Sequence, residues 1–190
     1  MSKHPDTSQQ GFSLLEGLVV MGIISIVLAM AIISFGNMMP NAKANSAVAQ
    51  MLYRLRSARE QAIAHRREVQ VQFVGTNQLT IAELWVTGTP PPPTTYTFEG
   101  GAQYVVLPGV PDTPMAFGNS APIYFAGVSG GPPIMKFTTN GSFIDGGNTL
   151  VNGTVFLGIP GKNQSARAVT ILGATGRVRE YHYDNTQWQE

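Results

Sequence analysis

The chain has 190 residues, enough for a membrane segment and one further domain. Its net charge is +1 and only 12% of its residues are charged, so bulk electrostatics predicts no general attraction to nucleic acid or to anionic lipid. Glycine (21) and proline (13) are abundant, which is typical of many turns and short strands. Cysteine is absent, so packing and not disulfides must hold the fold together.

Residues 17–39 form an uncharged, mostly apolar segment that follows a short polar stretch. At a helical rise of ~1.5 Å per residue it reaches ~35 Å, which suffices to cross a ~30 Å hydrocarbon core with some tilt. Glu16 lies at the start of this segment, where an unpaired carboxylate is costly. Cleavage between Gly11 and Phe12 would place a new α-ammonium group at the same depth, where it could neutralise the carboxylate.

The sequence Gly-Phe-Ser-Leu-Leu-Glu at 11–16, followed by the apolar segment, resembles the class III leader of type IV pilins and pseudopilins. The resemblance implies that a prepilin peptidase cuts after Gly11 and methylates Phe12 as the new N-terminus. It implies that Glu16 neutralises the N-terminus of a neighbouring subunit during filament assembly. The alternative is an ordinary signal peptide or signal anchor, but a signal-peptide core spans only about 7–15 residues and has no use for Glu16.

The resemblance also implies a location and a set of partners. The protein would be a single-pass component of the bacterial inner membrane with a periplasmic C-terminal domain, and could form part of an extracytoplasmic filament. Its partners would be the peptidase, other pilin or pseudopilin subunits and the assembly platform. A third interpretation, a membrane-anchored sensor domain, would leave the chain uncut.

Beyond the apolar segment, Pro40 is expected to kink or interrupt the helix, because proline removes a backbone donor. Helical periodicity then resumes up to residue 67. Apolar residues recur at steps of three and four: Ala44, Val48, Met51, Leu55, Ala58 and Ala62. This stripe predicts one long helix whose second half lies on a sheet. We interpret the arginines of this segment as a solvated face near lipid headgroups rather than as a binding patch.

From Glu68 onward apolar and polar residues alternate, which predicts strands over 69–73, 79–85 and 104–107. Four consecutive prolines, Pro90–Pro93, favour polyproline II and cannot lie inside a sheet. We interpret them as a stiff surface loop and not as a ligand for an aromatic groove. Residues 108–122 are predicted to form a long irregular connection and are a candidate interaction loop.

The last third of the chain is more regular. Strands are predicted at 134–138, 142–144, 154–159, 166–172 and 177–183. The Asn140-Gly141 pair favours a tight hairpin between the first two of these strands.

These patterns predict an α+β protein with roughly seven to nine antiparallel strands against one long helix. The expected parts are a cleaved leader (1–11), a transmembrane and assembly helix (12–39), its amphipathic continuation (40–67) and a β-rich domain (68–190).

The C-terminal residues narrow the resemblance. The turn Phe-x-x-Asn-Gly-Ser at 137–142, Ala-Val-Thr-Ile-Leu-Gly at 168–173 and Gly-Arg-Val-Arg-Glu-Tyr at 176–181 are similar to the GspH/FimT branch of pseudopilins and minor pilins. Residues 75–130 carry no motif of that branch and are expected to be an insertion. The implied function is that of a minor subunit of a type II secretion or type IV pilus filament.

A FimT-like, DNA-binding minor pilin is the alternative, with Arg177, Arg179 and Tyr181 as the candidate DNA-binding residues. Strand alternation puts all three on one face, with the arginines ~6.6 Å apart, near the phosphate repeat of an extended strand. In the FimT-like branch a Gly-Arg-x-Arg tail is tied to DNA capture, and these residues match it. The competing interpretation is an edge strand whose arginines deter aggregation or pair with Glu180 and Asp184.

Arginines on the helix, Arg54 and Arg56, are expected to take no part in DNA binding. The chain is expected to be neither an enzyme nor a cofactor-binding protein. Its three histidines are scattered and cysteine is absent, which argues against a transition-metal site. Asp145 with Asn148 is interpreted as a turn, since calcium requires six to eight oxygen ligands.

Overall fold

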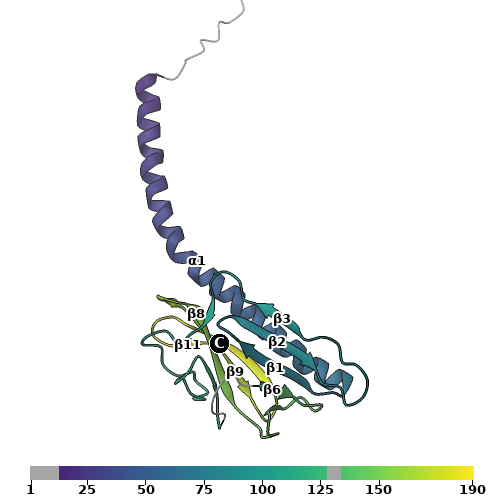
Figure 1. Ribbon diagram of the computed structural model, residues 1–190. Helices are drawn as coiled ribbons and strands as arrows, with labels where there is room; N and C mark the ends of the chain where they lie inside the picture. The colour runs from purple at the N-terminus through teal and green to yellow at the C-terminus, as the bar shows by residue number, and fades with distance from the viewer. Residues whose placement is uncertain (1–12, 128–133) are drawn as a thin grey trace, which may run out of the picture. The chain divides into compact units, whose positions relative to one another are not determined.

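The computed structural model describes residues 13–127 and 134–190. The chain divides into two compact units at the boundary between Met39 and Pro40, and helix α1 (Leu14–His65) contributes residues to both (Figure 1). The expected interruption at Pro40 does not occur, because the helix continues through this residue. The Pro40 side chain is buried, and its ring leaves one helical hydrogen bond unmade.

The second unit contains two antiparallel sheets. The first has the order β3-β2-β1-β6-β7. Its strands are β1 (Val69–Val74), β2 (Gln78–Glu83), β3 (Thr94–Thr97), β6 (Ile134–Phe137) and β7 (Phe143–Asp145). The β1–β2 hairpin turns at the predicted position and pairs Val69 with Glu83 and Val74 with Gln78.

The second sheet has the order β11-β10-β9-β8-β4, and β5 also pairs with β8. Its strands are β4 (Gln103–Tyr104), β5 (Ile123–Phe125), β8 (Gly153–Ile159), β9 (Lys162–Leu172), β10 (Arg177–Tyr183) and β11 (Trp188–Gln189). The long β8–β9–β10 meander is its centre, and the predicted bounds of β10 are confirmed.

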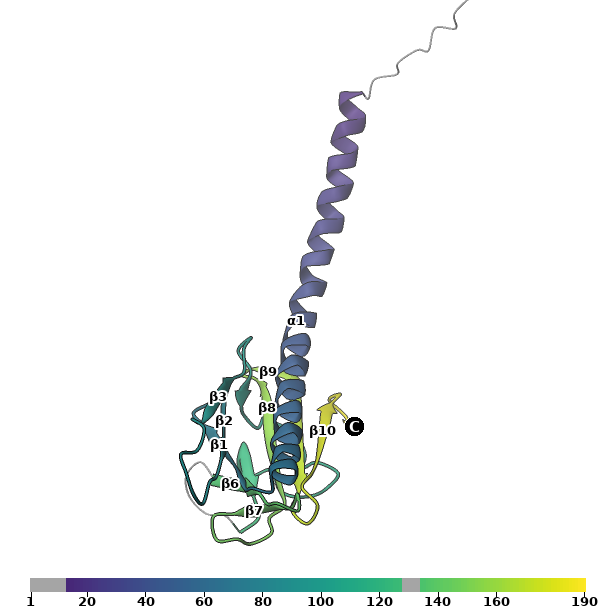
Figure 2. The ribbon, with the colours of Figure 1, turned by 90° about the vertical axis from the view of Figure 1, so that its right-hand side faces the viewer.

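The main core lies between the second half of α1 and both sheets (Figure 2). All six residues of the predicted helical stripe are at most 5% exposed, so the prediction of a helix packed on a sheet is confirmed. Phe137 and Phe143 lie with ring centroids 4.7 Å apart in the centre of this core. Burial of the helical stripe and the facing strand residues is the main stabilising contribution.

The irregular connection over 105–122 covers the outer face of the second sheet. Its apolar residues Leu107 and Val110 are buried, and Trp188 donates its indole N–H to the carbonyl of Pro111 at 3.0 Å. Two satellite clusters of apolar residues hold this connection in place. Their members are Val105, Val106, Leu107, Val110, Met115, Phe156, Ala166, Ala168, Tyr181, Tyr183 and Trp188. This candidate interaction loop therefore has a packing role.

Several strand predictions need correction. Strand β2 ends at Glu83, so Trp85 lies outside it, and β4 ends at Tyr104 although a strand was expected to continue to residue 107. The described residues contain eleven strands, more than expected, because β3, β5 and β11 are short and lack a clear alternation of apolar residues. Pro90–Pro93 lie outside the sheets, as predicted.

Candidate functional site

The first candidate site is the start of α1. The backbone N–H of Glu16 donates to Ser13 Oγ at 3.2 Å, so Ser13 acts as the N-cap. The cap places Glu16 in the first helical turn, where the helix dipole favours a negative charge. The other two predicted residues of this site, Gly11 and Phe12, lie outside the described residues.

An exposed apolar helix follows this carboxylate. Leu14–Ile32, 19 residues with a mean hydropathy of 2.5, is long and apolar enough to cross a membrane by length and composition. None of this window is buried within the chain. The backbone of Glu16 is thus fixed in the first turn of a capped helix, at one end of a surface that is suited to lipid or to other apolar helices.

The second candidate site is the outer face of β10. Tyr181 pairs with Ala168 and packs on Phe156, and it is only 4% exposed. The burial of Tyr181 argues against its candidacy as a DNA-binding residue, because the connection over 105–122 covers the ring. Strand alternation indicates which face a side chain occupies, but not which distant segment covers that face.

The two arginines of this strand differ in their surroundings. Arg179 Nη1 forms an ion pair with Glu190 Oε2 at 3.0 Å, and a hydrogen bond with Tyr181 raises the pKa of its guanidinium. The competing interpretation proposed ion pairs of these arginines with Glu180 or Asp184, and the described residues form neither pair. Three hydrogen bonds from Thr186 and Gln187 instead lower the pKa of Asp184 to about 2. Arg177 is exposed.

Helix α1 brings further arginines next to Arg177. A hollow of about 450 Å³ lies between the helix and the start of β10. It is lined by Arg56, Arg59, Glu60, Thr175, Gly176, Arg177 and Val178. Arg56 Nη2 donates to the carbonyl of Val178 at 3.3 Å. The fold thus places Arg56 beside the C-terminal strand, although it was expected to take no part in DNA binding, and the hydrogen bond joins residues 122 positions apart.

Arg59 connects the two sheets to the helix at this end. Its Nε donates to the carbonyl oxygens of Gly141 at 3.1 Å and of Thr175 at 2.9 Å. Gly141 and Gly176 both have positive φ angles, and a Cβ on Gly176 would lie 2.0 Å from the Gly141 oxygen. Only glycine allows the β6–β7 and β9–β10 turns to meet in this way.

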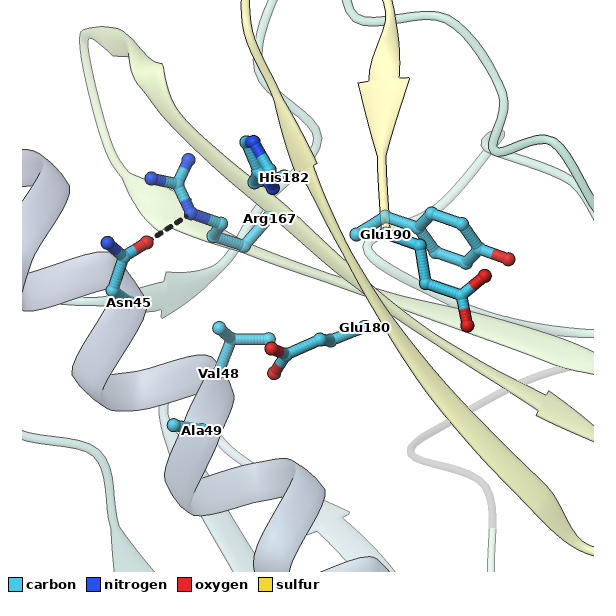
Figure 3. Close-up of a pocket in the computed structure, with 8 residues that line it drawn as sticks. Asn45, Val48, Ala49, Arg167, Glu180, His182 and Glu190 are labelled. Carbon is cyan, nitrogen blue, oxygen red and sulfur yellow. Dashed lines mark hydrogen bonds between the residues drawn. The ribbon is translucent and has the colours of Figure 1, made fainter.

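A second hollow, of about 480 Å³, lies farther along the same two elements (Figure 3). The Arg167 side chain reaches into it from β9, and its Nε donates to Asn45 Oδ1 at 2.7 Å. Burial lowers the pKa of this guanidinium, and the charge of Glu180 opposes the shift. Glu180 Oε2 is buried and has no hydrogen-bond partner among the described residues. Sequence reasoning considered Glu180 only as a partner of the β10 arginines and missed Arg167, although a lone arginine inside an apolar strand is a visible signal.

Polar clusters elsewhere have structural roles. Asp145 Oδ1 accepts hydrogen bonds from the backbone N–H groups of Gly147 and Thr149 at 2.9 and 2.8 Å, which confirms the predicted turn. His65 pairs with Glu83 at 3.1 Å. Within residues 13–127 and 134–190, no group of three or more His, Asp or Glu side chains is arranged to hold a metal ion.

Two family models match the sequence. The prokaryotic N-terminal methylation motif matches residues 6–32, and the model of type II transport protein GspH matches residues 47–175, more than half of the chain. The chain belongs to the GspH family. The protein is therefore a minor pilin or pseudopilin of the type IV pilus or type II secretion class. The matched range includes residues 75–130, and it ends before Arg177.

Solved structures include similar proteins. The minor pilin FimU of Pseudomonas aeruginosa has a TM-score of 0.49 at 17% identity, with 78% of this chain and 94% of that chain covered. The minor pseudopilin EpsH of the Vibrio cholerae type 2 secretion system has a TM-score of 0.47 at 16% identity, with 74% and 97% covered. No curated protein matches the sequence.

Proposed function

We propose that this GspH-family protein is a minor filament subunit that acts by assembly and not by catalysis. Its apolar helix is held in the bacterial inner membrane, and its β-rich domain lies in the periplasm. The observation that carries the proposal is the position of Glu16. It lies in the first turn of a capped helix whose following residues form an exposed apolar surface. Its partners are a prepilin peptidase, other pilin-like subunits and the assembly platform.

The physical basis of assembly is charge neutralisation in an apolar environment. Cleavage after Gly11 creates an ammonium group on Phe12, and a lone ammonium is expensive to place among apolar helices. Glu16 of an adjacent subunit supplies a carboxylate at matching depth. Packing of the apolar helices then stabilises the filament, and the charge pair sets the register between neighbours.

Processing is the direct test of this proposal. Co-expressed with a prepilin peptidase, the chain should lose residues 1–11 and begin with N-methylated Phe12, as read by mass spectrometry of the membrane fraction. Gly11→Ala should be cleaved more slowly and Gly11→Leu should not be cleaved, because the residue before the cut must fit a small pocket.

Gly17→Ala is the matched control, because a Cβ there meets nothing within 4 Å and cleavage should proceed as in the wild type. An intact Met1 or Ser2 terminus in the mature membrane protein would contradict the proposal and favour an uncut membrane-anchored sensor.

DNA binding is a second candidate function, and one observation favours it: exposed Arg177 lies beside Arg56. Two phosphate contacts predict weak, sequence-independent binding with a log–log salt slope of about −2 on duplex DNA. Arg177→Gln and Arg56→Gln should each reduce binding, measured by fluorescence anisotropy at ~50 mM salt. Lys162→Gln is the control and should leave DNA binding unchanged, because Lys162 is an exposed cation at the far end of β9. No binding by the wild-type chain under these conditions would exclude this function.

A further inference from the structure

The two hollows lie along one seam between α1 and β10. The hollow of about 450 Å³ is lined by Arg56 and Arg177. The hollow of about 480 Å³ is lined by Asn45 and Val48 of the helix and by Glu180 of the strand. We call the space between residues 45–60 of α1 and strand β10 the β10 seam. Both of its walls belong to the unit Pro40–Glu190.

The strand that forms one wall of the seam has an open edge. Strand β9 pairs with β10 from Arg177 to His182, whereas β11 pairs only with His182 and Tyr183. No described strand pairs with residues 177–181 on the β11 side. An open edge of this kind can accept a further strand.

The direction of the backbone groups can be read from two hydrogen bonds. The N–H of Asp184 donates to the carbonyl of Gln187 on the β11 side, and the carbonyl of Val178 accepts from Arg56. In an antiparallel strand the N–H and C=O of one residue point to the same side, and alternate residues share that side. The N–H and C=O of Glu180 therefore point to the open edge, where no described residue bonds them.

The charges along the seam favour an acidic partner. Arg56, Arg59, Arg167 and Arg177 form no ion pair with any carboxylate in the described parts of the chain. The acidic residues that line the two hollows are Glu60, Glu180 and Glu190, and Glu190 already pairs with Arg179. Among the described residues of the seam, four arginines therefore lack an ion pair, against two carboxylates, Glu60 and Glu180.

A second requirement comes from Glu180. Its Oε2 atom is buried without a hydrogen-bond partner, and such an atom gains from an incoming donor. A phosphate backbone has no hydrogen-bond donor to offer this carboxylate. A peptide supplies main-chain N–H groups together with acidic side chains, so it meets both requirements.

We propose that the β10 seam binds an acidic, extended segment of a protein partner, which adds as a strand to β10. Main-chain hydrogen bonds to Glu180 give the segment its register, and its carboxylates contact Arg56 and Arg177. This contact lies in the β-rich domain and is separate from the assembly role of Phe12 and Glu16, so failure of one leaves the other intact.

The test uses the full chain in detergent micelles and a labelled synthetic heptapeptide of alternating Glu and Val, acetylated and amidated at its ends. We expect binding by fluorescence anisotropy at low salt, weakened about tenfold or more when Gln replaces every Glu. A version with N-methylated alternate peptide nitrogens should not bind, because it lacks the main-chain donors. In hydrogen exchange, the peptide should slow the Glu180 amide at least about tenfold and leave the Arg179 amide, which faces β9, unchanged.

Two variants sharpen the test. Glu180→Pro should lose binding at least about tenfold, since proline lacks the donor yet is tolerated on an edge whose N–H faces outward. Arg177→Gln should weaken binding about tenfold, with Lys162→Gln as the neutral control. If Glu180→Pro does not fold, the N-methylated peptide answers the same question. No binding, equal binding of the N-methylated peptide, or an unprotected Glu180 amide would overturn the proposal. The proposal would also be overturned if duplex DNA bound through Arg177 under the same conditions and the peptide did not.

Discussion

Replacing Glu16 with alanine is expected to leave processing intact and to remove the protein from the filament. The substitution leaves the neighbouring subunit's ammonium group without a counter-charge among apolar helices, and breaking such a buried pair costs about 3–5 kcal/mol. The start of α1 should persist, because the hydrogen bond to Ser13 uses the backbone of Glu16 and not its carboxylate. Glu16→Gln should show the same defect, since it keeps the shape of the side chain and removes only the charge.

The measurement is cysteine or photochemical crosslinking to partner subunits, with mass spectrometry of the N-terminus in the same samples. Ser25→Ala is the matched control in the same helix, since among the described residues Ser25 Oγ donates to the local carbonyl of Met21 at 2.8 Å and to no other group. This control should be incorporated at the wild-type level. Wild-type crosslinking of the processed Glu16→Ala protein would refute the pairing role.

The second large effect is expected from Gly176→Ala, which should destabilise the β-rich domain by roughly 3 kcal/mol or more. A non-glycine residue at a φ of 59° carries a penalty of about 1–2 kcal/mol. The larger part comes from the new Cβ, 2.0 Å from the carbonyl oxygen of Gly141. This neighbour is backbone, so relief requires the β6–β7 and β9–β10 turns to separate.

Gly75→Ala is a closely matched control, because Gly75 has the same φ of 59° and a Cβ there meets nothing within 4 Å. It should cost only about 1–2 kcal/mol. The loss of unfolding free energy in each variant is measured by urea denaturation of a fragment that begins at Pro40, monitored by circular dichroism. Equal destabilisation by the two substitutions would show that backbone conformation, and not the approach of the two turns, governs this site.

The sequence predicts the parts of the fold in which burial follows a regular period. The helical stripe from Ala44 to Ala62 and the alternation in Val69–Val74 each repeat against a continuous apolar surface, so a short window reveals them. Strand Thr94–Thr97 escapes this reasoning because it is a mostly exposed edge that directly follows the proline run. Such short edges are held by pairing to a neighbour, which no local pattern encodes.

The candidate sites also differ in whether a local sequence pattern can reveal them. Glu16 is recognisable because its cap, its neighbours and its apolar helix are contiguous in sequence. The burial of Tyr181 depends on the connection over 105–122, and the closeness of Arg56 to Arg177 depends on how the helix lies along β10. Both features arise from contacts between distant segments, so neither strand alternation nor composition could reveal them.

The contacts of Arg59 also determine how the β-rich domain bears mechanical load. In a filament, a subunit is pulled through its helix while its domain is held by other molecules. Because Arg59 bonds one turn from each sheet at the same helical position, tension on α1 reaches both sheets together. A helix that bonded one sheet alone at this position would transmit that tension to a single sheet.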